Sequence, residues 1–482
     1  MAKQEENFVK EITNKDEDFS RWYVDVVRKA DLADYSSIKG CMVIKPYGYE
    51  LWENIKNGLD KMIKATGHKN AYFPLFVPES LLKKEAEHVK GFAPEVAWIT
   101  HGGDEELEER LAIRPTSEAI ICATYSEWVQ SWRDLPILIN QWANVVRWEK
   151  VTRLFLRTRE FLWQEGHTAH ATAEEAEVET LKMLGVYKEL AENFLAMPVL
   201  IGRKSEAQKF PGAVHTYAVE SLMSNGWALQ AGTSHNLGQH FAKVFDIQYL
   251  DKNQEQQYVW QTSWGVSTRL IGGVIMTHGD NAGLILPPKI APIQAIIVPI
   301  IFEKSRAEVL EKVNQLIQSL SDKFRVEADL RDEYTPGWKY NEWELKGVPI
   351  RIEVGPRDVK NEQVVVVRRD TREKTIVKEA DLKGVIEKML DDIQAGIFQK
   401  AKDFRDNHTY NVDDFATFES IMEEGRGFIY SNWCGSSDCE KTIQDKTSAT
   451  IRCIPLEGAE PTGKCVHCDE EGKYKVYFAK AY

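Results

Sequence analysis

Hydrophobic and polar positions recur with two different periods along the first part of the chain. Ile55, Leu59 and Ile63 share one helical face, which predicts an amphipathic helix over residues 46–66, and a second helix is predicted over 174–195. Alternating or apolar runs predict strands over residues 70–78, 137–151, 157–170, 227–245 and 259–280. The last two of these ranges also contain Gly-rich turns. This part of the chain therefore predicts a largely antiparallel sheet with helices packed against it.

Two changes of pattern divide the rest of the chain. After the proline-rich segment 286–292, apolar strands alternate with a helix, which predicts a small α/β module. The segment 401–414 is polar and is predicted to be irregular. We therefore expect an α+β protein with domains at 1–290, 291–400 and 401–482, the last a small α/β domain that carries a cysteine cluster.

Composition is that of a soluble globular protein with more than one hydrophobic core. The chain has 482 residues, of which 43% are hydrophobic and 28% charged. Its most apolar run, residues 290–301, is short and holds two prolines, which favours a buried strand over a membrane span. The charged N-terminus lacks an apolar export signal, so a cytoplasmic location without a membrane partner is expected. The net charge of −13 argues against a nucleic-acid partner, although a local basic face could still bind one.

The stretch RTREFLWQEGHTAH (157–170) has the composition of a pocket wall. With the period of a strand, one face collects cations, aromatic rings, a carboxylate and an imidazole from Arg157, Arg159, Phe161, Trp163, Glu165 and His167. A hairpin with the preceding VVRWE would add Arg147 and Glu149 to this face. Arginine matches phosphate or carboxylate, a carboxylate accepts from an exocyclic amine, and a ring stacks on a base. The set therefore suits a nucleotide, with exposed cross-strand ion pairs as the alternative.

Five of the seven cysteines lie between Cys434 and Cys468. NWCGSSDCE and GKCVHCDE give C-x4-C and C-x2-C, a spacing similar to that of structural zinc sites with four thiolate ligands. The expected ligands are Cys434, Cys439, Cys465 and Cys468. Cys453 and His467 are spare candidates, reduced thiols without metal are the alternative, and disulfides are not expected in a reducing cytoplasm.

Several of these motifs together resemble the class II aminoacyl-tRNA synthetases. Arg147-x-Glu149, a short loop and Arg157-x3-Phe161-x3-Glu165 resemble motif 2 of that class. The helix 46–66 with the following proline-containing strand resembles motif 1, and Arg269 in STRLIGG resembles the motif 3 arginine. RPTSE, WQEGHTAH, GTSHNLGQ and HGDNAGLILPPKIAP are similar to segments of the prolyl-tRNA synthetases of the archaeal and eukaryotic kind. The resemblance covers nearly the whole chain.

The resemblance implies ATP-dependent attachment of L-proline to tRNA(Pro) in two steps, with prolyl-adenylate as the intermediate and Mg²⁺ bound with the phosphates. Arg147 would bridge the proline carboxylate and the α-phosphate, Glu149 would read the adenine amine, and Phe161 and Arg269 would cover the two adenine faces. The remaining ATP and magnesium contacts would come from Arg157, Thr158, Gln230 and Thr233. Thr116 and Glu118 would hold the proline ammonium. The proline ring pocket would be lined by Trp163, Glu165, His167 and His235.

The resemblance also implies partners and a missing domain. The motif 1 region would build a homodimer, and the α/β module would bind the anticodon, with base contacts sought in residues 335–347 and at Arg351. The stretch 170–260 is too short for an editing domain, and the final Tyr482 would fold back toward the active site.

Two alternatives of other classes remain. One is a non-catalytic paralogue that kept the fold as an RNA-binding module. The other is a zinc hydrolase built on His167 and His170, which lacks the HExxH arrangement. Within the leading class, an amino acid other than proline remains formally possible.

Overall fold

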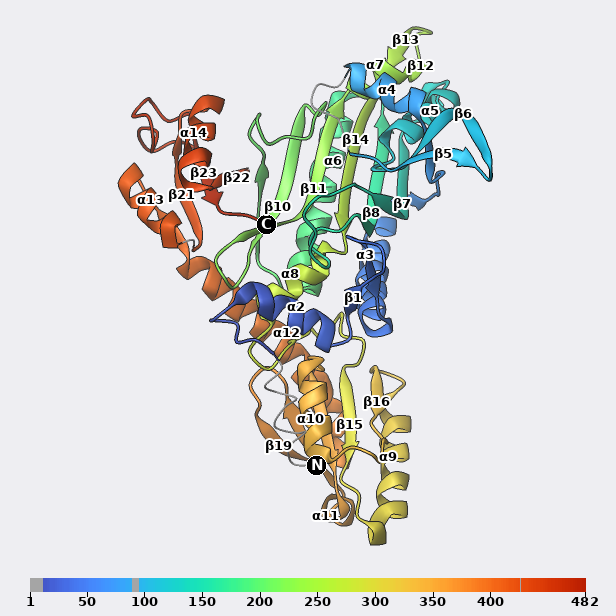
Figure 1. The fold of residues 1–482 in the computed structure, drawn as a ribbon, viewed down its shortest axis with the longest axis vertical. Coiled ribbons are helices and arrows are strands. Elements are labelled where there is room, and N and C mark those ends of the chain that lie inside the picture. The colour runs from blue at the N-terminus through green and yellow to red at the C-terminus, as the bar shows by residue number, and fades with distance from the viewer. Residues whose placement is uncertain (1–11, 89–94, 425) are drawn as a thin grey trace.

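The computed structural model describes residues 12–88, 95–424 and 426–482, and these fold into three parts that meet around α2, α8 and α12 (Figure 1). The expectation about an export signal falls mainly on residues 1–11, outside the described residues. Within the described ranges, every helix is too short or too polar to cross a bilayer.

The first part contains the elements α2 (Phe19–Lys29), β1 (Ala33–Tyr35), β2 (Met42–Ile44), α3 (Pro46–Ala65), β3 (Lys69–Asn70), β4 (Phe76–Pro78), α4 (Glu79–His88), β5 (Trp98–Gly102), β6 (Glu105–Ile113), α5 (Glu118–Trp128), η1 (Trp132–Asp134), β7 (Ile137–Val146), β8 (Glu160–His170), α6 (Ala173–Glu189), η2 (Leu190–Phe194), β9 (Val199–Arg203), β10 (His215–Leu222), β11 (Ala228–Gly238), α7 (His240–Phe245), β12 (Gln248–Leu250), β13 (Gln256–Tyr258), β14 (Trp260–Ser267) and α8 (Arg269–His278). Both predicted helices are present, as α3 and as α6 with η2.

An 11-stranded sheet runs through the first and third parts in the order β20-β21-β23-β22-β9-β10-β11-β14-β8-β7-β3. Its central strands, from β9 to β7, are all antiparallel neighbours, as predicted. Helix α6 covers one face, where Tyr187 and Leu184 pack with Leu229 and Trp264 of the sheet in the main core. The opposite face of β8, β11 and β14 is therefore left to build a site.

The strand predicted over 259–280 is wrong in its second half, because residues 269–278 form helix α8. Almost every side chain of α8 is buried, so the helix has no polar face from which a helical period could be read. Gly272 is needed there, since a Cβ would collide with Leu156 and with the Tyr23 hydroxyl. Residues 240–245 of another predicted strand are likewise helical, as α7.

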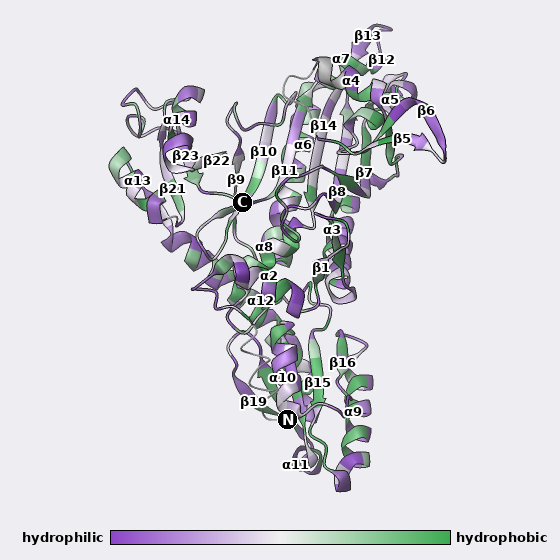
Figure 2. Cartoon of the chain, in the orientation of Figure 1, coloured by the Kyte–Doolittle hydropathy of each residue, from purple (hydrophilic) through white to green (hydrophobic). Residues whose placement is uncertain are grey.

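The second part is an α/β layer with a five-stranded sheet in the order β16-β15-β17-β18-β19. Helix α9 shows alternating green and purple along its length, as an amphipathic helix on a sheet requires (Figure 2). Its elements are β15 (Ala295–Pro299), η3 (Glu303–Ser305), α9 (Arg306–Leu320), β16 (Val326–Ala328), α10 (Pro336–Leu345), β17 (Ile350–Val354), α11 (Pro356–Lys360), β18 (Gln363–Arg368), β19 (Lys374–Lys378), η4 (Glu379–Asp381) and α12 (Leu382–Asn407).

Helix α12 leads directly into the third part, so the prediction of an irregular segment over 401–414 is wrong for its first seven residues. The buried positions Ile393, Ile397 and Ala401 continue one apolar stripe past residue 400, and this packing keeps the polar end of the segment helical. The third part contains β20 (Thr409–Asn411), α13 (Phe415–Glu424), β21 (Phe428–Trp433), α14 (Ser437–Thr447), β22 (Thr450–Pro455) and β23 (Tyr474–Ala479).

Candidate active site

A cavity of about 350 Å³ lies on the sheet face opposite α6. It collects eleven of the residues predicted for a site, from α5, the β7–β8 hairpin, β11 and α8: Thr116, Glu118, Arg147, Phe161, Trp163, Glu165, His167, Gln230, Thr233, His235 and Arg269. A smaller hollow adjoins it and shares Arg147, Phe161 and Arg269 with it. Three more of the predicted residues line this hollow: Glu149, Arg157 and Thr158.

Strand β8 presents alternate residues to the cavity, as its sequence predicted. Phe161, Trp163, Glu165 and His167 line the cavity. Gln164, between them, faces the core, where the Tyr187 hydroxyl donates to Gln164 Oε1 at 2.6 Å. The predicted hairpin is present, with Val146 opposite Glu160 and the Arg147 amide donating to the Arg159 carbonyl at 2.8 Å.

Arg159 does not join its neighbours in the cavity. Strand β8 begins only at Glu160, and the Arg159 guanidinium instead donates to the carbonyls of Glu149, at 3.2 Å, and Lys39, at 3.0 Å. The period of a strand therefore fails at residue 159 because that residue belongs to the loop.

Glu165 is the centre of a buried hydrogen-bond network. Its carboxylate accepts from Ser117 Oγ at 2.5 Å, Gln141 Nε2 at 2.8 Å and His167 Nε2 at 3.0 Å. Burial would raise the pKa of Glu165, but these donors outweigh it and lower the pKa. Burial would lower the pKa of His167, yet the Glu165 contact and the charge of Glu118 raise it. The network therefore favours a carboxylate beside an imidazolium.

Glu118, at the start of α5, offers an acceptor to the same space. It is 5% exposed, and its Oε2 accepts a short hydrogen bond from the Thr116 hydroxyl. Ligand atoms of Glu118, Glu165 and His167 lie within 4.8 Å of one another. Because protein donors already occupy Glu165, the Glu118 carboxylate is the better placed of the two acids to receive a cationic ligand.

Two half-buried arginines stand at the junction of the two hollows. Among the described residues, the guanidinium of Arg147 makes one hydrogen bond, from Nε to the Pro115 carbonyl at 3.0 Å, and that of Arg269 makes one, to the Leu156 carbonyl at 3.2 Å. Burial, followed by repulsion from Arg147 and Arg157, lowers the pKa of Arg269 to about 10. Cations that the fold leaves without carboxylate partners are suited to a polyanionic ligand.

His167 and His170 lie on opposite faces of β8, so they do not form a metal pair. His167 contacts Glu165 in the cavity, whereas His170 Nε2 lies 2.7 Å from the Thr168 hydroxyl on the α6 side. Burial lowers the pKa of His170 to about 4, which keeps it neutral. The geometry therefore contradicts a hydrolase built on this pair.

The four predicted cysteines converge at the end of the third part. Cys439 and Cys465 lie with their sulfurs 3.6 Å apart, as do Cys434 and Cys468, and all four sulfurs lie within 4.8 Å of one another. Cys453 is fully buried in β22 and does not belong to this group of sulfurs. Of the spare candidates, only His467 approaches the cluster, with Nδ1 3.4 Å from Cys439 Sγ.

The chain end lies against the first residues of β11. The Tyr482 amide donates to the Ala228 carbonyl at 3.1 Å, and its hydroxyl accepts from Asn225 Nδ2 at 2.8 Å. Two residues beyond Ala228, the same strand brings Gln230 into the cavity. The fold-back of Tyr482 onto the sheet that carries the site is therefore present.

Comparisons with known proteins agree over the whole length. Residues 98–278 match the class II tRNA synthetase core domain (G, H, P, S and T), 294–389 an anticodon binding domain, and 415–482 the prolyl-tRNA synthetase C-terminal domain. The proline–tRNA ligases of Natranaerobius thermophilus and Alkaliphilus oremlandii are each 61% identical to this chain, with all of both chains covered. Proline–tRNA ligase 2 of Clostridioides difficile is 55% identical with the same coverage.

The chain belongs to the prolyl-tRNA synthetase family. The predicted resemblance is confirmed, and the chain is a class II aminoacyl-tRNA synthetase with an anticodon-binding domain. As in the expected type, residues 170–260 hold only α6, η2, the strands β9 to β13 and α7, without an inserted domain.

The sequence of this prolyl-tRNA synthetase did not reveal one wall of the cavity. The loop between β9 and β10 contributes Gln208, Lys209, Phe210 and Pro211. Phe210 is fixed by its amide, which donates to Thr216 Oγ1 at 2.9 Å. A Pro-Gly pair signals a turn here, but no local pattern indicates that the turn folds over the sheet.

His235 on β11 completes that wall. Its ring lies 4.8 Å from the Phe210 ring, and Nδ1 is 2.9 Å from the Thr216 hydroxyl. Burial, and then the charge of His167, lowers the pKa of His235 to about 3. A neutral His235 is hydrogen-bonded to Thr216 and adds no second cation beside His167.

Proposed function

We propose that this chain joins L-proline to tRNA(Pro) in two steps, forming prolyl-adenylate from proline and ATP and then transferring the prolyl group to the tRNA 3′ end. The observation that carries the proposal is one continuous hollow with acids at one end and uncompensated arginines at the other. Arg147 lies between the two ends. Such a site holds an amino acid and a triphosphate at the distance needed for reaction.

The acidic end suits the secondary ammonium of proline. Glu118 supplies negative charge, and the Thr116 hydroxyl that donates to it fixes its orientation. Trp163 and His235 supply flat walls for the ring. Glu165 and His167 are already paired with each other, because their hydrogen bond and mutual charge outweigh the effect of burial on the pKa of each. The ammonium thus meets a single available carboxylate, Glu118.

The cationic end suits ATP. Arg147 would neutralise the proline carboxylate and the α-phosphate as the new bond forms, a use of preorganised charge that needs no proton transfer. Phe161 and Arg269 would enclose the adenine, and Glu149 would accept from its amine. Arg157, Thr158, Gln230 and Thr233 would complete the phosphate contacts. Magnesium bound with the phosphates would neutralise further charge, as it does in class II synthetases.

The cysteine cluster fits a structural zinc ion. Four thiolates bound at about 2.3 Å in a tetrahedron place their sulfurs about 3.8 Å apart, and two of the sulfur pairs here lie at 3.6 Å. Zinc held by Cys434, Cys439, Cys465 and Cys468 would cross-link α14 to the segment before β23. No open ligand position is then left for catalysis.

The partners follow from the other two parts. A hollow of about 140 Å³ in the α/β layer is lined by Trp343 of the predicted anticodon segment and by arginines that include Arg351. A homodimer through the motif 1 region is supported by β3 at the sheet edge and by nearby Tyr72 and Phe76, which are 71% and 47% exposed. We place the enzyme in the cytoplasm, with domains divided near residues 290 and 400.

The test is the exchange of pyrophosphate into ATP by the purified chain, measured with each of the twenty amino acids in turn. Proline is expected to give the dominant signal. A stronger signal for another amino acid would reject the substrate, and the absence of exchange with tRNA binding intact would favour the non-catalytic RNA-binding alternative.

A further inference from the structure

The cavity loop between β9 and β10, residues 204–214, is anchored at its start by the third part of the chain. The Ser205 hydroxyl donates to Glu440 Oε1 of α14 at 2.8 Å, and both residues are buried. The Ser205 carbonyl in turn accepts from the amides of Gln208 and Lys209 at 3.1 and 3.0 Å. Gln208 and Lys209 line the cavity, so Ser205 connects the cavity wall to α14.

The Glu440 carboxylate is buried but makes few hydrogen bonds, which is energetically unfavourable. It is 2% exposed, and its Oε2 has no hydrogen-bond partner among the described residues. Burying a carboxylate for one hydrogen bond is unfavourable compared with an apolar side chain of similar size. Stability alone therefore does not account for a carboxylate here, whereas holding Ser205 does.

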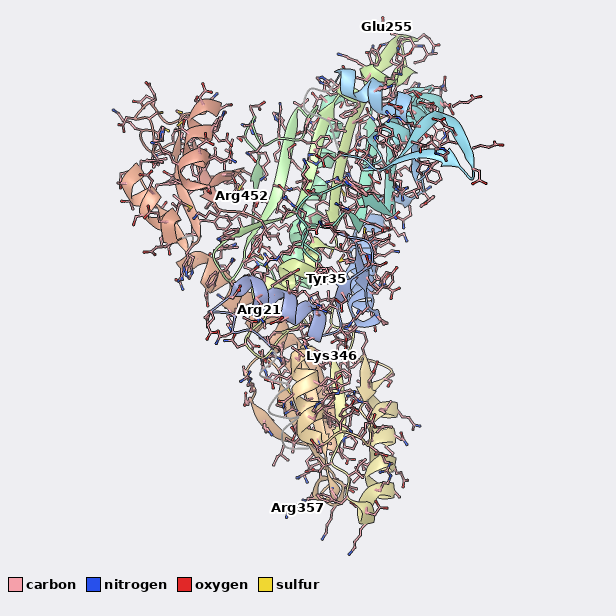
Figure 3. The ribbon with its side chains drawn as sticks, in the orientation of Figure 1. Arg21, Tyr35, Glu255, Lys346, Arg357 and Arg452 are labelled. Atoms are coloured by element: carbon pink, nitrogen blue, oxygen red, sulfur yellow. The ribbon has the colours of Figure 1, made fainter. Side chains whose placement is uncertain are left out.

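A second contact fixes the residue before Ser205. Lys204 Nζ donates to Glu220 Oε1 at 2.7 Å and to the Arg452 carbonyl of β22 at 2.8 Å. The Arg452 guanidinium donates to Glu220 at 2.9 Å. Arg452 lies on β22, the strand through which the third part joins β9 of the first part (Figure 3).

The backbones also meet at this point. Strand β22 pairs with β9, Ile454 opposite Arg203, immediately before the loop. Gly202 is required, because a Cβ would fall inside van der Waals contact of the Ile454 carbonyl. The third part therefore holds the end of β9 and the first two residues of the loop, Lys204 and Ser205.

We propose that Glu440 is a positioning residue for the amino-acid end of the cavity, acting through Ser205 on the loop that carries Gln208 to Pro211. The inference rests on the proposed function, because it takes this end as the proline pocket. Without the Glu440 contact the loop samples open conformations, and the apparent affinity for proline becomes the intrinsic affinity multiplied by the fraction of molecules that remain closed. ATP meets the other end of the hollow and is not affected.

The full-length chain with Ser205→Ala or Glu440→Ala tests this. Each variant is expected to raise the KM for proline by roughly tenfold, the effect of losing one hydrogen bond to a carboxylate, with the KM for ATP unchanged. Amide hydrogen exchange over residues 206–213 is expected to accelerate. Glu440→Gln keeps an acceptor for Ser205 and is expected to restore the closed loop. Asp445→Ala removes an exposed acid from the same helix and serves as the control.

The double variant is expected to have the KM for proline of either single variant, since both remove the same contact. Unchanged proline KM and unchanged exchange over 206–213 in both single variants would overturn the proposal. So would equal losses for proline and ATP, which would indicate general destabilisation. Failure of the pocket assignment is recognised separately, because Glu118→Gln would then leave the KM for proline unchanged.

Discussion

Replacing Arg147 with methionine separates catalysis from stability. Arg147 lines both hollows, and its side chain makes one hydrogen bond among the described residues, from Nε to the Pro115 carbonyl. A neutral acceptor of this kind contributes about 1 kcal/mol. Burial acts in the opposite direction, because it lowers the pKa of Arg147 despite the nearby charges of Glu118, Glu165 and Glu149. Because the two effects oppose one another, Arg147→Met is expected to change the free energy of unfolding by less than the hydrogen bond alone contributes, about 1 kcal/mol.

The effect on catalysis is expected to be much larger. Arg147 would contact two groups, the proline carboxylate and the α-phosphate, whose charge must be neutralised in the transition state. Loss of one preorganised donor in such a site costs about 10²–10³ in rate, or about 3–4 kcal/mol. We therefore expect proline-dependent pyrophosphate exchange to fall at least a hundredfold, with the thermal midpoint measured without substrates nearly unchanged.

Arg133→Met is the matched control, because Arg133 is exposed and lies outside both hollows. Exchange within a few-fold of the unmodified enzyme in the Arg147 variant would refute its assigned role. A large drop in the thermal midpoint alongside lost exchange would show that Arg147 acts through the fold.

Three further predictions follow from the site, the buried histidines and the cysteines. Glu118→Gln keeps the side-chain volume but removes the charge that we propose faces the proline ammonium. It is expected to raise the KM for proline by about tenfold or more in the exchange assay with little change for ATP, and an equal rise for both substrates would contradict this. Burial lowers the pKa of both His170 and His278 to about 4. Below about pH 6.5 these histidines are therefore protonated in the unfolded chain, whereas in the folded chain they stay neutral down to about pH 4. Stability is therefore expected to fall through this window, by about 1.4 kcal/mol per histidine at pH 5.5, and His170→Gln should flatten the pH dependence of the thermal midpoint; an unchanged slope would reject the assignment. Elemental analysis of chain purified without chelators is expected to find one zinc per chain, and Cys465→Ser is expected to lose it and to unfold the third part at lower temperature; metal-free chain of normal stability would favour reduced thiols.

The cavity was largely predictable because one strand supplies much of it. Strand β8 pairs without interruption with β7 on one side and with β14 on the other, so its two faces stay distinct along its length. Glu165 and His167 therefore emerge on the same side, as their spacing predicted. The short loop that precedes the strand returns Arg147 to the same surface. Alternate residues of a strand lie on the same face wherever the strand is straight and paired on both sides, so there the sequence pattern predicts which side chains lie together.

The loop with Ser205 could not be predicted, because its position is set by a partner 235 residues away. Helix α8 was missed for another reason. It is buried on all sides, so its sequence lacks the polar face that distinguishes a helix from a buried strand. Long-range anchoring and complete burial both remove the local signal on which periodicity depends.

Net charge was misleading for a related reason. The chain carries −13 overall, yet Arg147, Arg157 and Arg269 lie together within the hollow in which we propose that ATP binds. The fold neutralises many other cations, as where Arg368 pairs with Asp370 at 2.8 Å, but leaves these three without carboxylate partners among the described residues. Burial, and then repulsion from Arg147 and Arg157, lowers the pKa of Arg269, and a bound anion would offset that repulsion. Substrate charge thus completes the electrostatics of the site, and a sum over the whole sequence cannot report this because it counts paired and unpaired cations alike.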